Sequence, residues 1–215
     1  MVYDVHMFGL IIDTREIFIS SNLNESIEDS MIDHVVFSNF IKNLRILNSI
    51  GNDPILIHLG TCGGDWNYGI AIYDAIKESC DDENSSDIIV LSHASARSMS
   101  SVIPQAASLR IIMPNADYLV HYGSSGYIGN HRSFVSEAQQ AEESNDTMLQ
   151  IYVNRIKNSD FFINKQWTEK QIMNWLKHNI DKKQEFYMTA REAVEKGFAD
   201  AVLGDKGYES IDRLR

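Results

Sequence analysis

The spacing of apolar residues along the first half of the chain predicts strands that alternate with helices. Three short apolar runs have the length and composition of β-strands, at 16–20, 55–59 and 88–91. From Ile27 onward, apolar residues recur near the 3.6-residue period of an amphipathic helix, with Asn24 or Ser26 as its predicted N-cap. A further helix is predicted over 68–76.

The second half of the chain continues the alternation. A turn of small residues at 94–98 leads into a predicted helix over 98–107, and short strands are predicted at 110–113 and 118–120. A long helix follows over 131–157. Capping-box patterns beginning at Thr168 and Thr189 open two more helices, and a last strand is predicted at 201–203. Strands that alternate with helices indicate an α/β protein with a largely parallel sheet.

Length and composition favour one packed domain over the whole chain, residues 1–215. The formal net charge of −11 argues against a nucleic-acid partner, since phosphate contacts need clustered Lys and Arg. No run approaches the roughly 20 apolar residues of a membrane helix, and no leader pattern opens the chain. The two cysteines lack ligand partners at metal-site spacing. We therefore expect a cytoplasmic protein with no membrane partner and no metal.

Ser98 is a candidate nucleophile because it follows a buried strand and opens a helix. A serine hydroxyl becomes reactive when a neighbouring base accepts its proton. Serine is also favoured at helix starts for capping alone, which is a structural reading of the same position. The spacing does not choose among the serines of this segment, which also holds Ser92, Ser95, Ser100 and Ser101.

His121 and the Gly63-Gly64 pair are the other candidates. His121 ends the strand predicted at 118–120, and strand ends line the crevice of an α/β sheet. The diglycine follows a buried strand and lets the backbone approach a ligand closely. Each has a plain structural alternative, a packed core histidine and a strand-to-helix connection.

Read together, these segments resemble the Clp protease proteolytic subunit family. The stretch GGDWNYGIAIYD at 63–74 is similar to the family's GG-x4-G-x2-IYD segment, and 96–99 resembles its AASM nucleophile segment. The spacing from Pro114 to His121 matches its PN-x5-H segment. Residues 189–200 resemble SA-x-EAVE-x-G-x-x-D, while Tyr3-Asp4-Val5 and 15–18 resemble the family's opening. The likeness covers about residues 3–204.

The resemblance implies a fold and a role for each matched residue. The fold would be a spiral of β-β-α units, as in the wider ClpP and crotonase superfamily, with a long protruding handle helix in a handle region at about 123–180. Ser98 would attack a peptide carbonyl, and His121 would act as its general base. The backbone N–H groups of Gly64 and Met99 would form the oxyanion hole, and extended substrate would lie beside the strand after Gly64 and near the segment after His121.

The third member of the triad is left open by the sequence. The family's usual Asp aligns with Glu185 here, and Asp181 is the rival one helical turn earlier. Two further departures concern spacing and substrate contacts. The stretch between Ser98 and Pro114 is about two residues shorter than usual, and Tyr122-Gly123 replaces the family's Gln-Pro after the histidine.

The resemblance also implies partners. We expect a peptide or unfolded-protein substrate and homo-oligomeric rings, either a heptamer or a tetradecamer, with no cofactor. Whether an AAA+ unfoldase is a partner stays open, because the family usually has an axial-loop segment before the stretch that begins here at Tyr3, and the given sequence starts almost at that stretch. Any use of ATP would come from another chain, since no Gly-x4-Gly-Lys-Ser/Thr loop is present. Two alternative functions remain: an inactive or regulatory ring subunit, and a crotonase-type enzyme acting on acyl-CoA.

Overall fold

The computed structural model describes residues 2–20, 31–124 and 126–214, and it confirms a mixed α/β fold. The larger of two sheets has the strand order β1-β2-β3-β4-β6-β9. All neighbours from β2 onward are parallel, as predicted, and β1 is antiparallel to β2. The strands are β1 Leu10–Ile11, β2 Glu16–Ile19, β3 Ile55–Leu59, β4 Ile88–Ser92, β6 Leu109–Ile112 and β9 Ala201–Val202.

A smaller sheet carries much of the candidate site. It has the order β5-β7-β8, with β5 (Ser95–Arg97) parallel to β7 (Asp117–His121) and β8 (Glu185–Thr189) antiparallel to β7. Alternate residues of β8 are buried and exposed, as expected for a sheet with one face against the core. Tyr118 and Val120 are buried in that core, so their neighbour His121 lies on the opposite, more accessible face.

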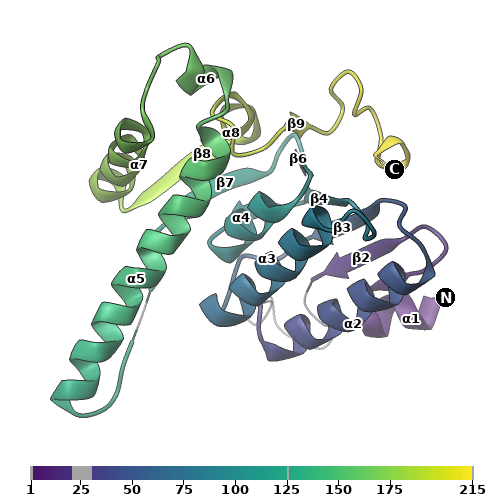
Figure 1. Ribbon diagram of the computed structural model, residues 1–215, viewed down its shortest axis with the longest axis horizontal. Coiled ribbons are helices and arrows are strands. Elements are labelled where there is room, and N and C mark those ends of the chain that lie inside the picture. The colour runs from purple at the N-terminus through teal and green to yellow at the C-terminus, as the bar shows by residue number, and fades with distance from the viewer. Residues whose placement is uncertain (1, 21–30, 125, 215) are drawn as a thin grey trace.

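The helices pack around the two sheets, and one of them extends well beyond the body of the molecule. In Figure 1, α5 projects away from the sheets, and α7 lies beside its C-terminal part. The long helix predicted over 131–157 is therefore confirmed to within one residue. The helices are α1 Val2–Phe8, α2 His34–Ile50, α3 Trp66–Asp81, α4 Met99–Val102, η2 Ile103–Ala106, α5 His131–Ile156, α6 Asp160–Ile163, α7 Glu169–Lys183, α8 Ala190–Glu195 and η3 Ile211–Arg213.

The buried strand β3 packs on both of its faces. Ile55, Ile57 and Leu59 belong to the main core, while Leu56 belongs to a second cluster on the other face of the sheet. Fully burying a Leu or Ile side chain contributes about 1.5–3 kcal/mol. This strand therefore anchors the sheet, and it holds the start of the Gly60–Gly64 loop in place. The C-terminal segment covers the second cluster through Leu214.

The first predicted helix begins later than expected. The pattern predicted a helix from Ile27, but α2 begins at His34, and Met31 and Ile32 are not helical. Asp33 is the N-cap, and its carboxylate accepts hydrogen bonds from the N–H groups of Val35 and Val36. The predicted caps Asn24 and Ser26 lie outside the described residues. Ile32 instead pairs with Gly64 across the fold, a contact that local periodicity does not reveal.

The helix predicted over 98–107 is divided into two short elements. The α-helix α4 ends at Val102, and the 3₁₀-helix η2 continues from Ile103. Pro104 explains the division, because proline lacks an N–H to donate within a helix and its ring crowds the preceding turn. The capping boxes predicted at Thr168 and Thr189 are both present.

Candidate active site

Ser98 occupies a strained turn between β5 and α4. Its φ of 52° and ψ of −130° lie in a region that residues with a Cβ adopt at a cost of about 1–3 kcal/mol. Ser98 is the N-cap residue of α4, yet its side chain makes no capping hydrogen bond. The structural explanation for a serine at a helix start therefore does not account for this hydroxyl. Backbone strain with no local benefit is typical of functional sites.

The diglycine loop packs directly against the Ser98 turn. A Cβ added at Gly63 would lie 2.6 Å from Cβ of Ser98 and 3.1 Å from the backbone N of Met99. The φ of Gly63 is 117°, which also favours glycine. The diglycine loop and the Ser98 turn, which are far apart in sequence, therefore pack so closely that no side chain fits between them. The side-chain hydroxyl of Thr61 bonds within this loop, to the Gly63 backbone.

The other side of the diglycine loop is held by Ile32. The N–H of Ile32 donates to the carbonyl of Gly63 at 2.7 Å, and the N–H of Asp65 donates to the carbonyl of Ile32 at 2.8 Å. Both bonds involve the neighbours of Gly64, so the N–H and C=O of Gly64 itself point toward the opposite edge. That orientation suits the predicted role of Gly64 as an oxyanion donor.

His121 has a buried nitrogen that is left without a partner. Its Nε2 makes no hydrogen bond within the described part of the chain, so it is not bonded to the Ser98 hydroxyl in this conformation. Burial lowers the pKa of His121, and the charge of Glu185 opposes that shift. The imidazole is therefore held in its neutral form at neutral pH, which is the form a general base requires. A buried nitrogen without a partner costs about 1–3 kcal/mol.

The register of β7 and β8 decides which acidic residue faces His121. Glu185 is the direct partner of His121 in this antiparallel pair, which places the two Cβ atoms about 4.5–5.5 Å apart on one face. Asp181 lies on α7, and its charge acts on Tyr122. Of the two acids, Glu185 is the one whose charge reaches His121.

Two residues that sequence reasoning missed lie beside Glu185. The carboxylate of Glu185 is the main influence that raises the pKa of Tyr187 above its ordinary value. The guanidinium of Arg97 lies 5.5 Å from the centre of the Tyr187 ring and forms an ion pair with Asp117. Alternation along β5 and β7 would have placed Arg97 and Asp117 on the face of His121, but their contact with Tyr187 depends on the strand order.

The described residues offer no alternative site based on a metal. No group of three His, Cys, Asp or Glu side chains among them could hold a metal ion. None of the helices in residues 2–20, 31–124 and 126–214 is both long and apolar enough to cross a membrane.

Comparisons with known proteins identify the family to which the sequence and the fold are similar. The family model described as Clp protease matches residues 3–206. A Clp protease proteolytic subunit of Deinococcus radiodurans is 22% identical over 204 residues, covering 94% of this chain and 85% of the relative. Proteolytic subunit 2 of Tropheryma whipplei is 27% identical over 185 residues, covering 84% and 88%. The fold is similar to that of a ClpP1 mutant from Listeria monocytogenes, with a TM-score of 0.71, 21% identity and coverage of 95% and 96%.

Proposed function

The chain belongs to the Clp protease family, and on this premise we propose that it is a serine endopeptidase with Ser98 as nucleophile and His121 as general base. One observation carries the proposal: Ser98, whose hydroxyl makes no capping hydrogen bond, stands in a strained turn fitted against Gly63. The match to the Clp protease family favours peptide substrates over acyl-CoA thioesters.

The proposed reaction begins when Ser98 Oγ attacks the carbonyl carbon of a peptide bond. The hydroxyl proton passes to Nε2 of His121, which has no other partner among the described residues. The N–H groups of Gly64 and Met99 stabilise the negative charge that forms on the carbonyl oxygen, and one such donor is worth about 3 kcal/mol. His121 then gives the proton to the leaving amine, and water hydrolyses the acyl-enzyme by the same proton path.

Glu185 is proposed as the third member of the triad. Its position opposite His121 suits a carboxylate that orients the imidazole and stabilises the imidazolium formed during attack. Nε2 of His121 makes no hydrogen bond among the described residues in this conformation. Productive geometry thus requires His121 to approach both Ser98 and Glu185 more closely than in the resting site.

The proposed assembly is a ring of identical subunits that encloses the active sites, with unfolded polypeptide as substrate. Whether an AAA+ unfoldase feeds the ring, and the cytoplasmic location, stay predictions drawn from the sequence.

Labelling with a fluorophosphonate probe tests the assignment of Ser98. Wild type should be labelled at one site per chain by intact mass, and Ser98→Ala and His121→Ala should abolish labelling. Replacing a triad serine lowers kcat by about 10⁶-fold in another serine protease. Ser95→Ala is the matched control, because Ser95 is half-buried on the same segment and should leave labelling unchanged. Equal labelling of wild type and Ser98→Ala would remove Ser98 from the mechanism.

A second candidate function is a non-catalytic ring subunit. The absence of a hydrogen bond to Nε2 of His121 among the described residues favours it. A folded, ring-forming protein that is never labelled, yet co-purifies with an active homologue, would support this function over the first.

A further inference from the structure

The hydroxyl of Ser101 lies at a junction of three structural elements. Its Oγ is 2.7 Å from the carbonyl oxygen of Ser98, 3.0 Å from that of Leu119 and 2.6 Å from the hydroxyl of Tyr152. Ser101 and Tyr152 are fully buried. The three contacts come from the candidate nucleophile itself, from β7 two residues before His121, and from α5.

The hydroxyl protons available at this junction determine which group donates and which accepts in each hydrogen bond. Carbonyl oxygens only accept, so the single proton of Ser101 is shared between the carbonyls of Ser98 and Leu119. Tyr152 must therefore donate to Ser101 Oγ. Burial raises the pKa of Tyr152, so its hydroxyl keeps this proton at any working pH. Removing the hydroxyl of either residue leaves a buried polar group with one partner fewer.

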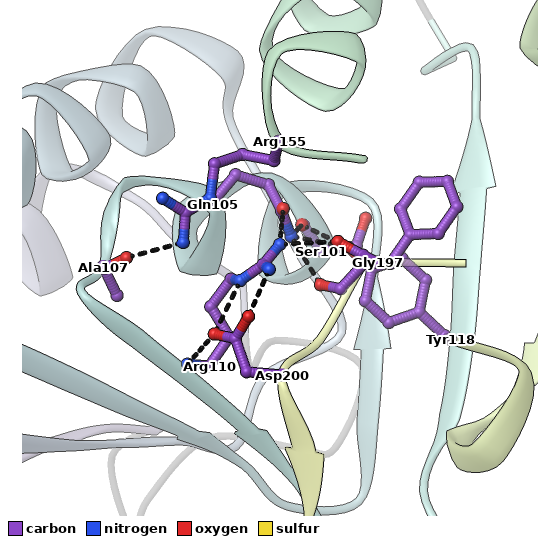
Figure 2. Close-up of polar contacts among 9 residues, drawn as sticks. Ser101, Gln105, Ala107, Arg110, Tyr118, Arg155, Gly197 and Asp200 are labelled. Carbon is purple, nitrogen blue, oxygen red and sulfur yellow. Dashed lines mark hydrogen bonds and ion pairs between the residues drawn. The ribbon is translucent and has the colours of Figure 1, made fainter. Parts of the chain in front are cut away.

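A network of buried polar groups fixes the backbone of Ser101. The carbonyl of Ser101 accepts hydrogen bonds from the Tyr118 hydroxyl at 2.7 Å and from the side-chain amide of Gln105 at 3.1 Å. Figure 2 shows Gln105 next to Arg110, which also contacts Gly197 and pairs with Asp200. Because the backbone of Ser101 is held in this way, its hydroxyl is a fixed point to which the Ser98 turn and β7 are attached.

We propose that Ser101 and Tyr152 are positioning residues that set the distance between Ser98 and His121 and couple it to the position of α5. The inference rests on the proposed function. The Ser98 turn is strained, so it keeps its geometry only if the surroundings hold it. Displacement of a reacting group by 1 Å can cost about 10²-fold in rate. If α5 moved at Tyr152, the hydroxyl of Ser101 would transmit that movement to the carbonyl groups of Ser98 and Leu119.

Ser100 provides a matched control for this inference. It is the adjacent serine, it is equally buried, and its Oγ has no hydrogen-bond partner in the part of the chain that the structure describes. Ser100→Ala and Ser101→Ala therefore remove the same atom from the same helix, but only the second removes the bonds to Ser98 and Leu119. Tyr152→Phe removes the remaining contact while keeping the ring in the core.

The experiment measures kcat and KM for a peptide substrate and the rate of fluorophosphonate labelling, together with Tm and assembly size. We expect Ser101→Ala and Tyr152→Phe to lower kcat and the labelling rate by about 10- to 100-fold, with KM within about twofold. Ser100→Ala should keep both rates within about twofold. The double variant Ser101→Ala/Tyr152→Phe should lose little more than either single variant, since the two hydroxyls act as one unit.

Two outcomes overturn the inference, and they are distinguishable. If wild type is labelled while Ser101→Ala and Tyr152→Phe both match Ser100→Ala in kcat, the positioning role fails and the proposed function stands. If wild type is never labelled and hydrolyses no peptide, the proposed function fails, and the positioning role fails with it. If Ser101→Ala does not fold, kcat and the labelling rate of Tyr152→Phe alone decide whether the positioning role stands or fails.

Discussion

At the scale of single residues, the candidate site is governed by how burial and charge act on histidine. His121 is half-buried on the accessible face of the smaller sheet, and its pKa is the balance of two opposing influences. Burial disfavours the charged imidazolium and is the larger influence, whereas the carboxylate of Glu185 favours it. The base is therefore ready to accept a proton at neutral pH.

Glu185→Gln should move the acid limb of the pH–rate profile to lower pH. The charge of Glu185 raises the pKa of His121, so its removal leaves burial unopposed and lowers that pKa further. The plateau rate should also fall, by up to about 10⁴-fold, because the imidazolium formed during attack loses its counter-charge. The profile of kcat/KM against pH reports the free enzyme. An acid limb that stays in place would show that Glu185 does not act on His121.

The contact between His58 and His93 predicts how the stability of the fold depends on pH. Glu16 Oε2 lies 2.8 Å from Nε2 of His58, whose Nδ1 lies 2.9 Å from Nε2 of His93. Burial, followed by the nearby His58, lowers the pKa of His93. As the pH falls below about 6.5, the unfolded chain takes up a proton at this position before the folded protein does. The folded protein therefore loses stability as the pH falls below that value. The loss ends once the pH is below the lowered pKa that His93 has in the folded state.

Urea unfolding at pH 7.5 and at pH 5 measures this loss. His93→Asn should show a smaller difference between the two midpoints than wild type, because the titrating imidazole is gone. His131→Asn is the comparison variant, since His131 is exposed at the start of α5 and should leave the difference unchanged. Equal pH dependence of wild type and His93→Asn would contradict the assignment.

At the scale of structural elements, the site is made by two loops fitted to each other. The Gly60–Gly64 loop follows β3, and the Ser98 turn follows β5, and they meet where Gly63 contacts Ser98. The close contact requires a residue without a Cβ on one side and an unusual φ on the other.

Gly63→Ala should destabilise the protein by about 1–3 kcal/mol and abolish probe labelling. The new Cβ would meet Ser98 Cβ at 2.6 Å, and a φ of 117° disfavours any side chain. Gly60→Ala is the control in the same loop, because its Cβ would meet only Ser20 at an ordinary 4.0 Å. That change should stay within about 0.5 kcal/mol. Equal denaturation midpoints and labelling for the two variants would show that the fit of the loops is unimportant.

How well an element can be predicted from the sequence depends on how far apart along the chain the residues that determine it lie. The capping boxes at Thr168 and Thr189 were predictable because each is complete within four residues. The start of α2 was not, since Ile32 is held extended by Gly64, more than thirty residues away. Ser98, His121 and Gly64 became candidates through ordered motifs, and their catalytic roles stay predictions. The contacts of Tyr187 and Ser101 depend on strand register and on the packing of α5, which no local pattern contains.

At the scale of the whole molecule, the free end of α5 exposes apolar side chains far from both sheets. Phe134 and Val135 are 56% and 43% exposed on this helix, which projects from the body in Figure 1. Exposed apolar clusters often mark surfaces that contact another protein. In the proposed ring assembly, we expect this end of α5 to contact the opposite ring.

Phe134→Ser should weaken the association of two rings while leaving each subunit folded. Burying a Phe side chain contributes about 1.5–3 kcal/mol, and this loss is repeated in every subunit of the ring. Sedimentation velocity should show smaller particles than wild type at equal concentration. Ile163→Ser removes another exposed apolar side chain, on α6, and should not change particle size. Unchanged particles for Phe134→Ser would place the ring contact elsewhere.

The pairing of Ile32 with the neighbours of Gly64 has a consequence for which polypeptides can be cut. With one edge of the backbone at Gly64 occupied by Ile32, Gly64 presents its N–H donor and its C=O acceptor together on the other edge. A polypeptide docking there would be recognised through its main chain, whatever its side chains. Helical segments satisfy their own amides and would be refused, and proline would be excluded where an amide hydrogen is needed. Discrimination would then depend on whether a chain is unfolded, more than on its sequence.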